Sequence, residues 1–161
     1  MNFLVERFKA GPLPSMLYRV HLARLRVWPP KTLGVRTVVL DDDRRVLLVR
    51  HCYRPGWFLP GGGVKRFETA EAAAIRETRE EAGVEIERLE RLVGLYPNFS
   101  RVRSDHVALF LAGPWRAVGT ESVEIAESGF FALDALPEAT TPATRRRLGE
   151  LFAGAPPADF W

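Results

Sequence analysis

Three glutamates within five residues are the side chains of this 161-residue chain that are best placed to do chemistry. Glu77, Glu80 and Glu81 follow three consecutive glycines, Gly61–Gly63, and a run of alanines. On an α-helix successive residues turn by about 100°, so the three carboxylates share one face. Like charges at positions i and i+4 repel each other, and a divalent cation would remove that repulsion. Oxygen ligands of this kind suit magnesium or manganese better than zinc or copper.

The neighbouring residues predict where this helix begins and ends. Thr69 is a good N-cap residue, Ala70 to Ala82 is rich in strong helix formers, and Gly83 stands where a left-handed C-cap is expected. Thr78 lies opposite the acids, and we expect its hydroxyl to bond back to the carbonyl of Ala74. By itself a glutamate-rich helix is equally well explained as a solvated charged face.

The spacing of the surrounding residues favours a specific metal site over a solvated face. A glycine is followed after five residues by Glu and after seven more by Arg-Glu-x-x-Glu-Glu-x-Gly-aliphatic. This pattern resembles the signature of the Nudix hydrolase family. The matching positions are Gly62, Glu68, Arg76, Glu77, Glu80, Glu81, Gly83 and Val84. Only Thr78 departs from the signature, where the family prefers an aliphatic residue, and Thr is close to Val in shape.

The resemblance implies a reaction and a cofactor. It implies that water attacks one phosphorus of the pyrophosphate in a nucleoside diphosphate linked to another moiety. It also implies that Glu77, Glu80 and Glu81 hold Mg²⁺ or Mn²⁺, with the carbonyl of Gly61 as a further ligand. Bound divalent ions would neutralise phosphate oxygens and lower the pKa of a water molecule.

The resemblance also implies roles for the other signature residues. Arg76 would orient the carboxylates by a charge-assisted hydrogen bond, and with Glu77 and Glu80 it forms the expected catalytic set. Glu68 is expected to brace the loop against the helix. The expected structural residues near the site are Gly62, Glu68 and Gly83. The general base is either a signature glutamate or an acid of a later loop, for which the candidates are Glu121, Glu124 and Glu127.

The signature does not specify the moiety attached to the pyrophosphate. Arginines can grip phosphates and aromatic rings can stack on a nucleobase. The candidate substrate-binding residues are Arg54, Tyr96, Phe99, Arg101 and Arg103, with Tyr53 as a further aromatic side chain. We expect a small nucleotide substrate and favour a nucleotide sugar such as ADP-ribose.

Two alternatives stay open, an enzyme acting on RNA 5′ ends and a non-catalytic nucleotide-binding module of the same fold. The net charge of +3 argues mildly against binding to nucleic acid. The complete set of signature acids argues against the module.

The remaining sequence predicts an α/β fold. The order of expected elements is similar to the Nudix fold, an α/β/α sandwich with a mixed sheet and the signature loop-helix-loop. We expect the first two strands to form a hairpin around Asp41–Asp43, and a loop near residues 97–100. Thr141 before Pro142 predicts the start of a terminal helix that ends near residue 152. Strands are expected at residues 34–40, 45–50, 57–60, 84–95, 103–112 and 123–133.

The chain is expected to form one main domain with two appendages. The expected parts are an N-terminal extension at residues 1–32, the Nudix domain at 33–152 and a C-terminal tail at 153–161. Within the extension, a helix capped by Ser15 would have an apolar face, which we expect to pack against its own domain or against a second copy in a homodimer.

Composition and targeting signals point to an ordinary globular enzyme. Cys52 is the single cysteine, which excludes an internal disulfide, and its place on a predicted strand before the signature predicts a buried thiol. The N-terminal residues lack the apolar run of a signal peptide, and no segment has the length and apolar character of a membrane span. We therefore expect a cytoplasmic location.

Overall fold

The computed structural model describes residues 31–100, 103–119 and 122–161, and the side chains of residues 100–104 are also outside this description. By their contacts, Met1–Lys31 and Thr32–Trp161 form separate units, of which the second is considered below. The helix predicted after Ser15 and the candidate residues Arg101 and Glu121 lie outside the described residues.

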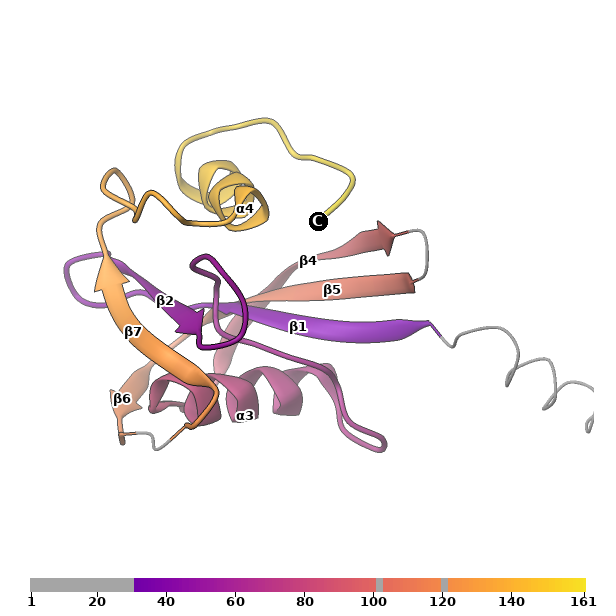
Figure 1. Ribbon diagram of the computed structural model, residues 1–161, viewed down its shortest axis with the longest axis horizontal. Coiled ribbons are helices and arrows are strands. Elements are labelled where there is room, and N and C mark those ends of the chain that lie inside the picture. Colours follow the sequence, from indigo (N-terminus) through magenta and orange to yellow (C-terminus); the bar gives the residue numbers. More distant parts are fainter. Residues whose placement is uncertain (1–30, 101–102, 120–121) are drawn as a thin grey trace, which may run out of the picture. The chain divides into compact units, whose positions relative to one another are not determined.

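A mixed three-stranded sheet forms the centre of the fold (Figure 1). β1 (Thr32–Val38) pairs in parallel with β5 (Arg103–Ala112), and β4 (Leu89–Ser100) pairs antiparallel with β5. Two further antiparallel pairs are β2 (Val46–His51) with β7 (Ile125–Phe131) and β3 (Val84–Ile86) with β6 (Trp115–Ala117).

Two helices lie on opposite sides of these strands, α3 (Ala70–Ala82) and α4 (Pro142–Phe152) (Figure 1). On one side, Ala73 and Ala74 of α3 pack against Val35 of β1. On the other side, Leu148 of α4 belongs to a buried cluster that includes Val38. This arrangement confirms the predicted α/β fold with helices on both faces of a mixed sheet.

The predicted boundaries of α3 are confirmed by its caps. The hydroxyl of Thr69 accepts a hydrogen bond from the Ala72 N–H at 3.1 Å, and Gly83 takes the left-handed conformation with φ 63°. The Thr78 side chain is fully buried and donates to the Ala74 carbonyl at 2.8 Å, as expected. This departure from the signature is therefore accommodated without an unpaired hydroxyl.

The expected hairpin between the first two strands is confirmed next to its turn, but it does not extend along the strands. The turn forms, because the Asp41 carboxylate accepts hydrogen bonds from the backbone and the side chain of Arg45. Next to the turn, pairing is limited to an isolated bridge between Leu40 and Val46 and its adjacent bonds. β1 and β2 instead find their main partners in β5 and β7, because such buried strands need paired neighbours from distant parts of the chain.

The loop expected near residues 97–100 is also wrong. β4 continues through Pro97 to Ser100 and pairs with β5 along this stretch. Proline is tolerated because β4 lies at the edge of the described sheet, where one side of the strand needs no ladder bonds. Residues 57–60 form only isolated bridges, and the short strand β6 had no sequence signal.

Cys52 is exposed, contrary to the expected buried thiol. β2 ends at His51, so Cys52 belongs to the following bend, with its Sγ 3.6 Å from the Val123 carbonyl oxygen. In the described part of the chain, no helix combines the length and apolar character needed to cross a membrane.

Candidate active site

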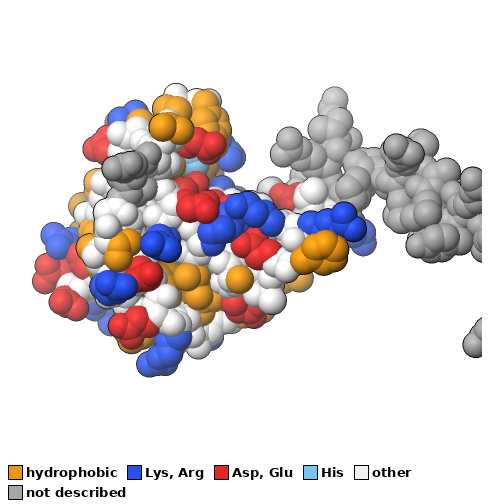
Figure 2. All heavy atoms as spheres, turned by 90° about the horizontal axis from the view of Figure 1, so that it is seen from below, with side chains coloured by type: hydrophobic (Ala, Val, Ile, Leu, Met, Phe, Trp, Pro, Cys, Tyr) orange, Lys and Arg blue, Asp and Glu red, His pale blue; other side chains and the backbone are white. Residues whose placement is uncertain are grey.

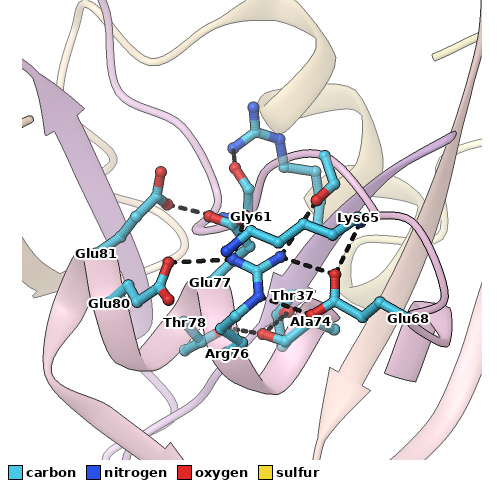
Figure 3. Close-up of polar contacts among 12 residues, drawn as sticks. Thr37, Gly61, Lys65, Glu68, Ala74, Arg76, Glu77, Thr78, Glu80 and Glu81 are labelled. Atoms are coloured by element: carbon cyan, nitrogen blue, oxygen red, sulfur yellow. Dashed lines mark hydrogen bonds and ion pairs between the residues drawn. The ribbon is translucent and has the colours of Figure 1, made fainter. Parts of the chain in front are cut away.

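A glycine segment lies directly against the acid-bearing face of α3 (Figure 3). Gly61 has φ 143°, and a Cβ at this position would collide with the Val35 carbonyl oxygen. The segment is held along β1 by two backbone bonds, from Val35 N–H to Gly62 at 2.8 Å and from Thr37 N–H to Pro60 at 2.9 Å. The Gly61 peptide is thereby fixed between the sheet and the helix.

Glu81 is the buried member of the three acids, with 8% of its surface exposed. Its Oε2 accepts a hydrogen bond from the Gly61 N–H at 2.8 Å. Burial is the main cause that raises the pKa of Glu81 to about 7, and the negative charges of Glu77 and Glu124 act in the same direction. The Gly61 N–H and the Arg36 guanidinium oppose the shift. A carboxylate with this environment gains from a nearby cation.

Arg76 connects the other acids to the loop (Figure 3). Its guanidinium donates to both oxygens of Glu68, at 2.7 and 2.9 Å, and to the Gly63 carbonyl at 3.2 Å. Its Nη1 also donates to Glu77 at 2.6 Å and to Glu80 at 3.1 Å. The bonds to Arg76, followed by the bond from the Lys65 N–H, lower the pKa of Glu68 to about 2. Glu68 thus bridges the loop backbone and the helix.

Glu77 rests on Gly62. A Cβ built on Gly62 would lie 2.7 Å from both carboxylate oxygens of Glu77, too close for any real contact. The neighbouring Gly63 has open space at the same position, with nothing within 4 Å. The close approach of the carboxylate therefore requires glycine at position 62 and does not require it at 63.

The donor atoms around this segment fit a hard divalent cation by their chemistry. They are carboxylate and carbonyl oxygens, one carboxylate is desolvated, and Gly62 leaves a cradle for another. Within residues 31–100, 103–119 and 122–161, no three acidic, histidine or cysteine side chains already surround a common point as ligands. Glu77 and Glu80 are held by Arg76 in this state, so a cation would have to replace those bonds.

A second group of side chains near the acids was not found from the sequence. Arg36 of β1 donates from Nη1 to the carbonyls of Leu59 at 2.8 Å and Gly61 at 2.6 Å. His51, at the end of β2, is 6% exposed and places Nε2 3.8 Å from Oε1 of Glu81. β1, β2 and α3 are distant in the sequence and meet only in the tertiary structure. No local sequence pattern therefore indicates these residues.

Burial and neighbouring charge keep the imidazole of His51 neutral. Burial is the main cause that lowers the pKa of His51, and the cationic Arg36 and Arg54 lower it further. Burial likewise lowers the pKa of Arg36, with Glu81 as the main opposing charge. The contact between His51 and Glu81 is therefore not an ion pair at neutral pH.

The predicted substrate residues fall into two places. Arg54 lies near Arg36 and His51, whose pKa values its charge lowers, with its guanidinium 4.4 Å from the centre of the Phe58 ring. Tyr96 lies under the guanidinium of Arg147, 3.9 Å from its ring centre, and also contacts Trp161.

Phe99 packs edge-on against His106 and Phe160, and so, like Tyr96, contacts the C-terminal segment. Arg103 belongs to β5, but its side chain is not among those described.

The two described candidates for a downstream base differ in their surroundings. Glu124 is exposed and close enough to Glu81 and Tyr53 to raise the pKa of both groups. Glu127 is paired with Arg50 at 2.9 Å on the strand pair β2–β7. The structure thus associates Glu124, and not Glu127, with the acid cluster.

Seen from the side of α3, the surface carries acidic and basic side chains next to one another (Figure 2). No continuous acidic patch covers this described face. This mixture agrees with the pairing of Arg76 with several acids.

Comparisons with known proteins agree with the signature. A family model described as NUDIX domain matches residues 30–152. A Bacillus subtilis protein assigned by name as an 8-oxo-dGTP diphosphatase is 32% identical over 77% of this chain and 82% of its own. An ADP-ribose pyrophosphatase of Methanocaldococcus jannaschii is 33% identical over 62% of each chain. The crystal structure of a MutT NUDIX hydrolase from Burkholderia pseudomallei has a TM-score of 0.64, 30% identity and coverage of 76% of this chain and 98% of its own.

The pKa of Glu81 predicts a pH-dependent stability of the metal-free protein. Glu81 holds its proton up to about pH 7 in the fold, against an ordinary value of 4.5, so its ionisation destabilises the fold as pH rises through this window. As pH rises from 4.5 to 8, the free energy of unfolding of Glu81→Gln should increase relative to that of the wild type by up to about 3 kcal/mol. Denaturant unfolding in EDTA measures this. Glu80→Gln, which alters an exposed acid, is the control; an equal pH profile for both variants would contradict the assignment.

The two adjacent glycines provide a matched test of the carboxylate cradle. Gly62→Ala should displace the Glu77 carboxylate and weaken Mn²⁺ binding by about tenfold or more, because its Cβ would overlap both oxygens. Gly63→Ala should bind Mn²⁺ like the wild type, since its Cβ meets nothing. Electron paramagnetic resonance of free Mn²⁺ gives both affinities. Equal affinities in the two variants would show that Glu77 does not depend on Gly62.

Proposed function

The chain belongs to the Nudix hydrolase family, and from this we propose that it cleaves the pyrophosphate of a nucleoside diphosphate linked to another moiety, using Mg²⁺ or Mn²⁺. The observation that carries the proposal is the position of Glu81. A buried carboxylate with a raised pKa is held against the Gly61 peptide, beside Glu77 over Gly62. Such an arrangement costs stability unless a cation compensates it.

The signature residues divide the work in this proposal. Glu77, Glu80 and Glu81 would hold the metal, together with the carbonyl oxygen of Gly61. The metal would supply charge neutralisation at the phosphates and an acidified water. Arg76 would keep the carboxylates oriented, since it already bonds to two of them.

Glu68, Gly62 and Gly83 would act structurally in this proposal. Glu68 bonds to the Lys65 N–H and to Arg76, which ties the loop to the helix. Gly62 provides space for Glu77, and Gly83 ends α3 with a bond from its N–H to the Arg79 carbonyl at 3.0 Å. Each keeps a metal-binding oxygen in place without contacting the substrate.

Glu124 is the proton acceptor that we propose for the attacking water. It stands close to Glu81 and Tyr53 and carries its carboxylate on an exposed segment before β7. A carboxylate that is not itself a metal ligand can accept a proton from the attacking water while the metal stays bound to its own ligands.

ADP-ribose or a related nucleotide sugar is the substrate class that we favour. Arg54 offers a guanidinium near Arg36 and His51, and Tyr53, with 66% of its surface exposed, offers a ring that can stack on a base. A relative named ADP-ribose pyrophosphatase supports this choice. Tyr96 and Phe99 are engaged by the C-terminal segment, which makes them weaker candidates for base stacking. A cytoplasmic location and a homodimer stay predictions.

A panel of substrates tests the reaction. ADP-ribose, NADH, dinucleoside polyphosphates, nucleoside triphosphates, including 8-oxo-dGTP, and 5′-triphosphorylated RNA are incubated with Mg²⁺ or Mn²⁺. We expect turnover of at least one nucleotide, fastest for ADP-ribose. Glu77→Gln, Glu80→Gln and Glu81→Gln should each lower kcat by roughly a hundredfold to a thousandfold, since each loses a charge that stabilises the transition state.

The control for this panel is Glu71→Gln, which removes an exposed acid from the first turn of the same helix and should keep full activity. Equal nucleotide binding by wild type and variants without turnover would instead support a binding module. Preferential turnover of RNA would support the alternative enzyme.

A matched pair of glutamates tests the proton acceptor. Glu124→Gln should lower kcat by about a hundredfold or more while leaving Mn²⁺ affinity unchanged, because the base contacts water and not the metal. Glu127→Gln removes an exposed ion pair with Arg50 and should leave kcat unchanged. The pH profile of kcat should lose its acidic limb only in the Glu124 variant. An unchanged kcat in that variant would assign the base to α3.

A further inference from the structure

His51 has a buried polar atom that needs a partner. The side chain is 5% exposed, and its Nδ1 is buried without a hydrogen-bond partner among the described residues. A buried nitrogen in this state is costly for the fold. The ring is enclosed by Tyr53, at 5.3 Å between ring centres, and by Phe58, at 5.5 Å. The imidazole is therefore fixed in orientation by packing, and one polar group on it is left for a ligand.

Arg36 has donor groups that its own contacts do not use. Among the described residues, both of its hydrogen bonds start from Nη1, to the carbonyls of Leu59 and Gly61. These bonds fix the plane of the guanidinium. Its Nε and Nη2 carry further donors, which an oxyanion can accept in a bidentate manner.

The side chains of Arg36, Arg54 and His51 lie around the ring of Phe58. The guanidiniums of Arg36 and Arg54 lie 5.8 and 4.4 Å from its centre, and His51 meets it edge-on. Arg36 and His51 also lie next to Glu81, whose charge acts on Arg36 and whose Oε1 lies 3.8 Å from Nε2 of His51. One guanidinium and one neutral imidazole thus stand beside the buried acid of α3.

We propose that Arg36 and His51 bind the non-bridging oxygens of the substrate's pyrophosphate next to the acids of α3. This inference rests on the proposed function. Phosphate oxygens are acceptors only, which matches the donors of Arg36 and an imidazole that carries its hydrogen on Nδ1. A sugar hydroxyl or a base edge could also accept hydrogen bonds from both groups, but as a neutral group it would not balance the charge of the guanidinium. Both residues are then specificity-determining for the phosphates and independent of the attached moiety.

The experiment measures binding of methylenediphosphonate, a non-hydrolysable pyrophosphate that lacks the nucleoside. Isothermal titration calorimetry with Mg²⁺ compares the wild type with Arg36→Gln, Arg36→Lys and His51→Phe. We expect affinity to fall by about tenfold to a hundredfold in Arg36→Gln, less in Arg36→Lys, and about tenfold in His51→Phe. His51→Phe keeps an aromatic ring against Phe58 and removes the unpartnered nitrogen, so its melting temperature should not fall.

Two controls separate this role from a structural one. Arg50→Gln changes the exposed neighbour on β2 and should bind the diphosphonate like the wild type. Titration of Mn²⁺ alone should give unchanged affinity in His51→Phe, and in the Arg36 variants, which alter a bond to the Gly61 carbonyl, a change much smaller than the loss of diphosphonate affinity. A parallel loss of Mn²⁺ affinity would show that Arg36 and His51 act through Gly61 and Glu81, and unchanged diphosphonate affinity would exclude contact with the phosphates; either result overturns the inference.

The same measurements keep this inference distinct from the proposed reaction. A wild type that binds the diphosphonate but hydrolyses no member of the substrate panel would remove the proposed reaction and leave the binding result standing. A wild type that hydrolyses nucleotides while Arg36→Gln and His51→Phe keep full diphosphonate affinity would remove only the inference.

Discussion

The position of the Gly61 peptide is the constraint on which the site depends. The Gly61 N–H donates to the buried carboxylate of Glu81, and the Gly61 carbonyl accepts a hydrogen bond from Arg36. A side chain at this position would collide with Val35. Three elements, β1, the glycine loop and α3, therefore meet at one residue. The Pro60–Gly61 peptide cannot rotate without breaking the bond to Glu81, and the Gly61–Gly62 peptide cannot rotate without breaking the bond from Arg36. This rigidity places a carbonyl oxygen and two carboxylates close together before any ligand arrives.

Arg76 explains how so many acids persist without a metal. One guanidinium bonds to Glu68, Glu77 and Glu80, which removes most of the repulsion that their spacing would create. The cost is that the same bonds occupy the oxygens that a cation needs. Glu81 differs, because its contact is to a backbone N–H and its environment is desolvated. It is thus the carboxylate whose charge is least compensated, and the natural first point of attraction for a divalent ion.

The sequence predicted what is encoded locally. The caps of α3 at Thr69 and Gly83 and the back-bond of Thr78 follow from residues within a few positions of each other, and all are present in the structure. The errors concern features that depend on distant partners: the pairing of β1 with β5, the continuation of β4 through an edge proline, and the exposure of Cys52 just beyond β2. Arg36 and His51 were not identified as site residues for the same reason. A single arginine in one strand and a single histidine at the end of another show no characteristic spacing.

The distribution of charge indicates why metal and substrate should bind together. Acids come from α3 and from Glu124, whereas Arg36 and Arg54 stand on β1 and on the segment after β2. A pyrophosphate alone would meet uncompensated carboxylates, and a cation alone would meet the guanidinium that bonds to Gly61. A metal–pyrophosphate pair brings both signs of charge and can satisfy both sides at once. In the proposed function the site would therefore recognise the complex of metal and phosphate, and the exposed Tyr53 would be left to contact what the phosphates carry.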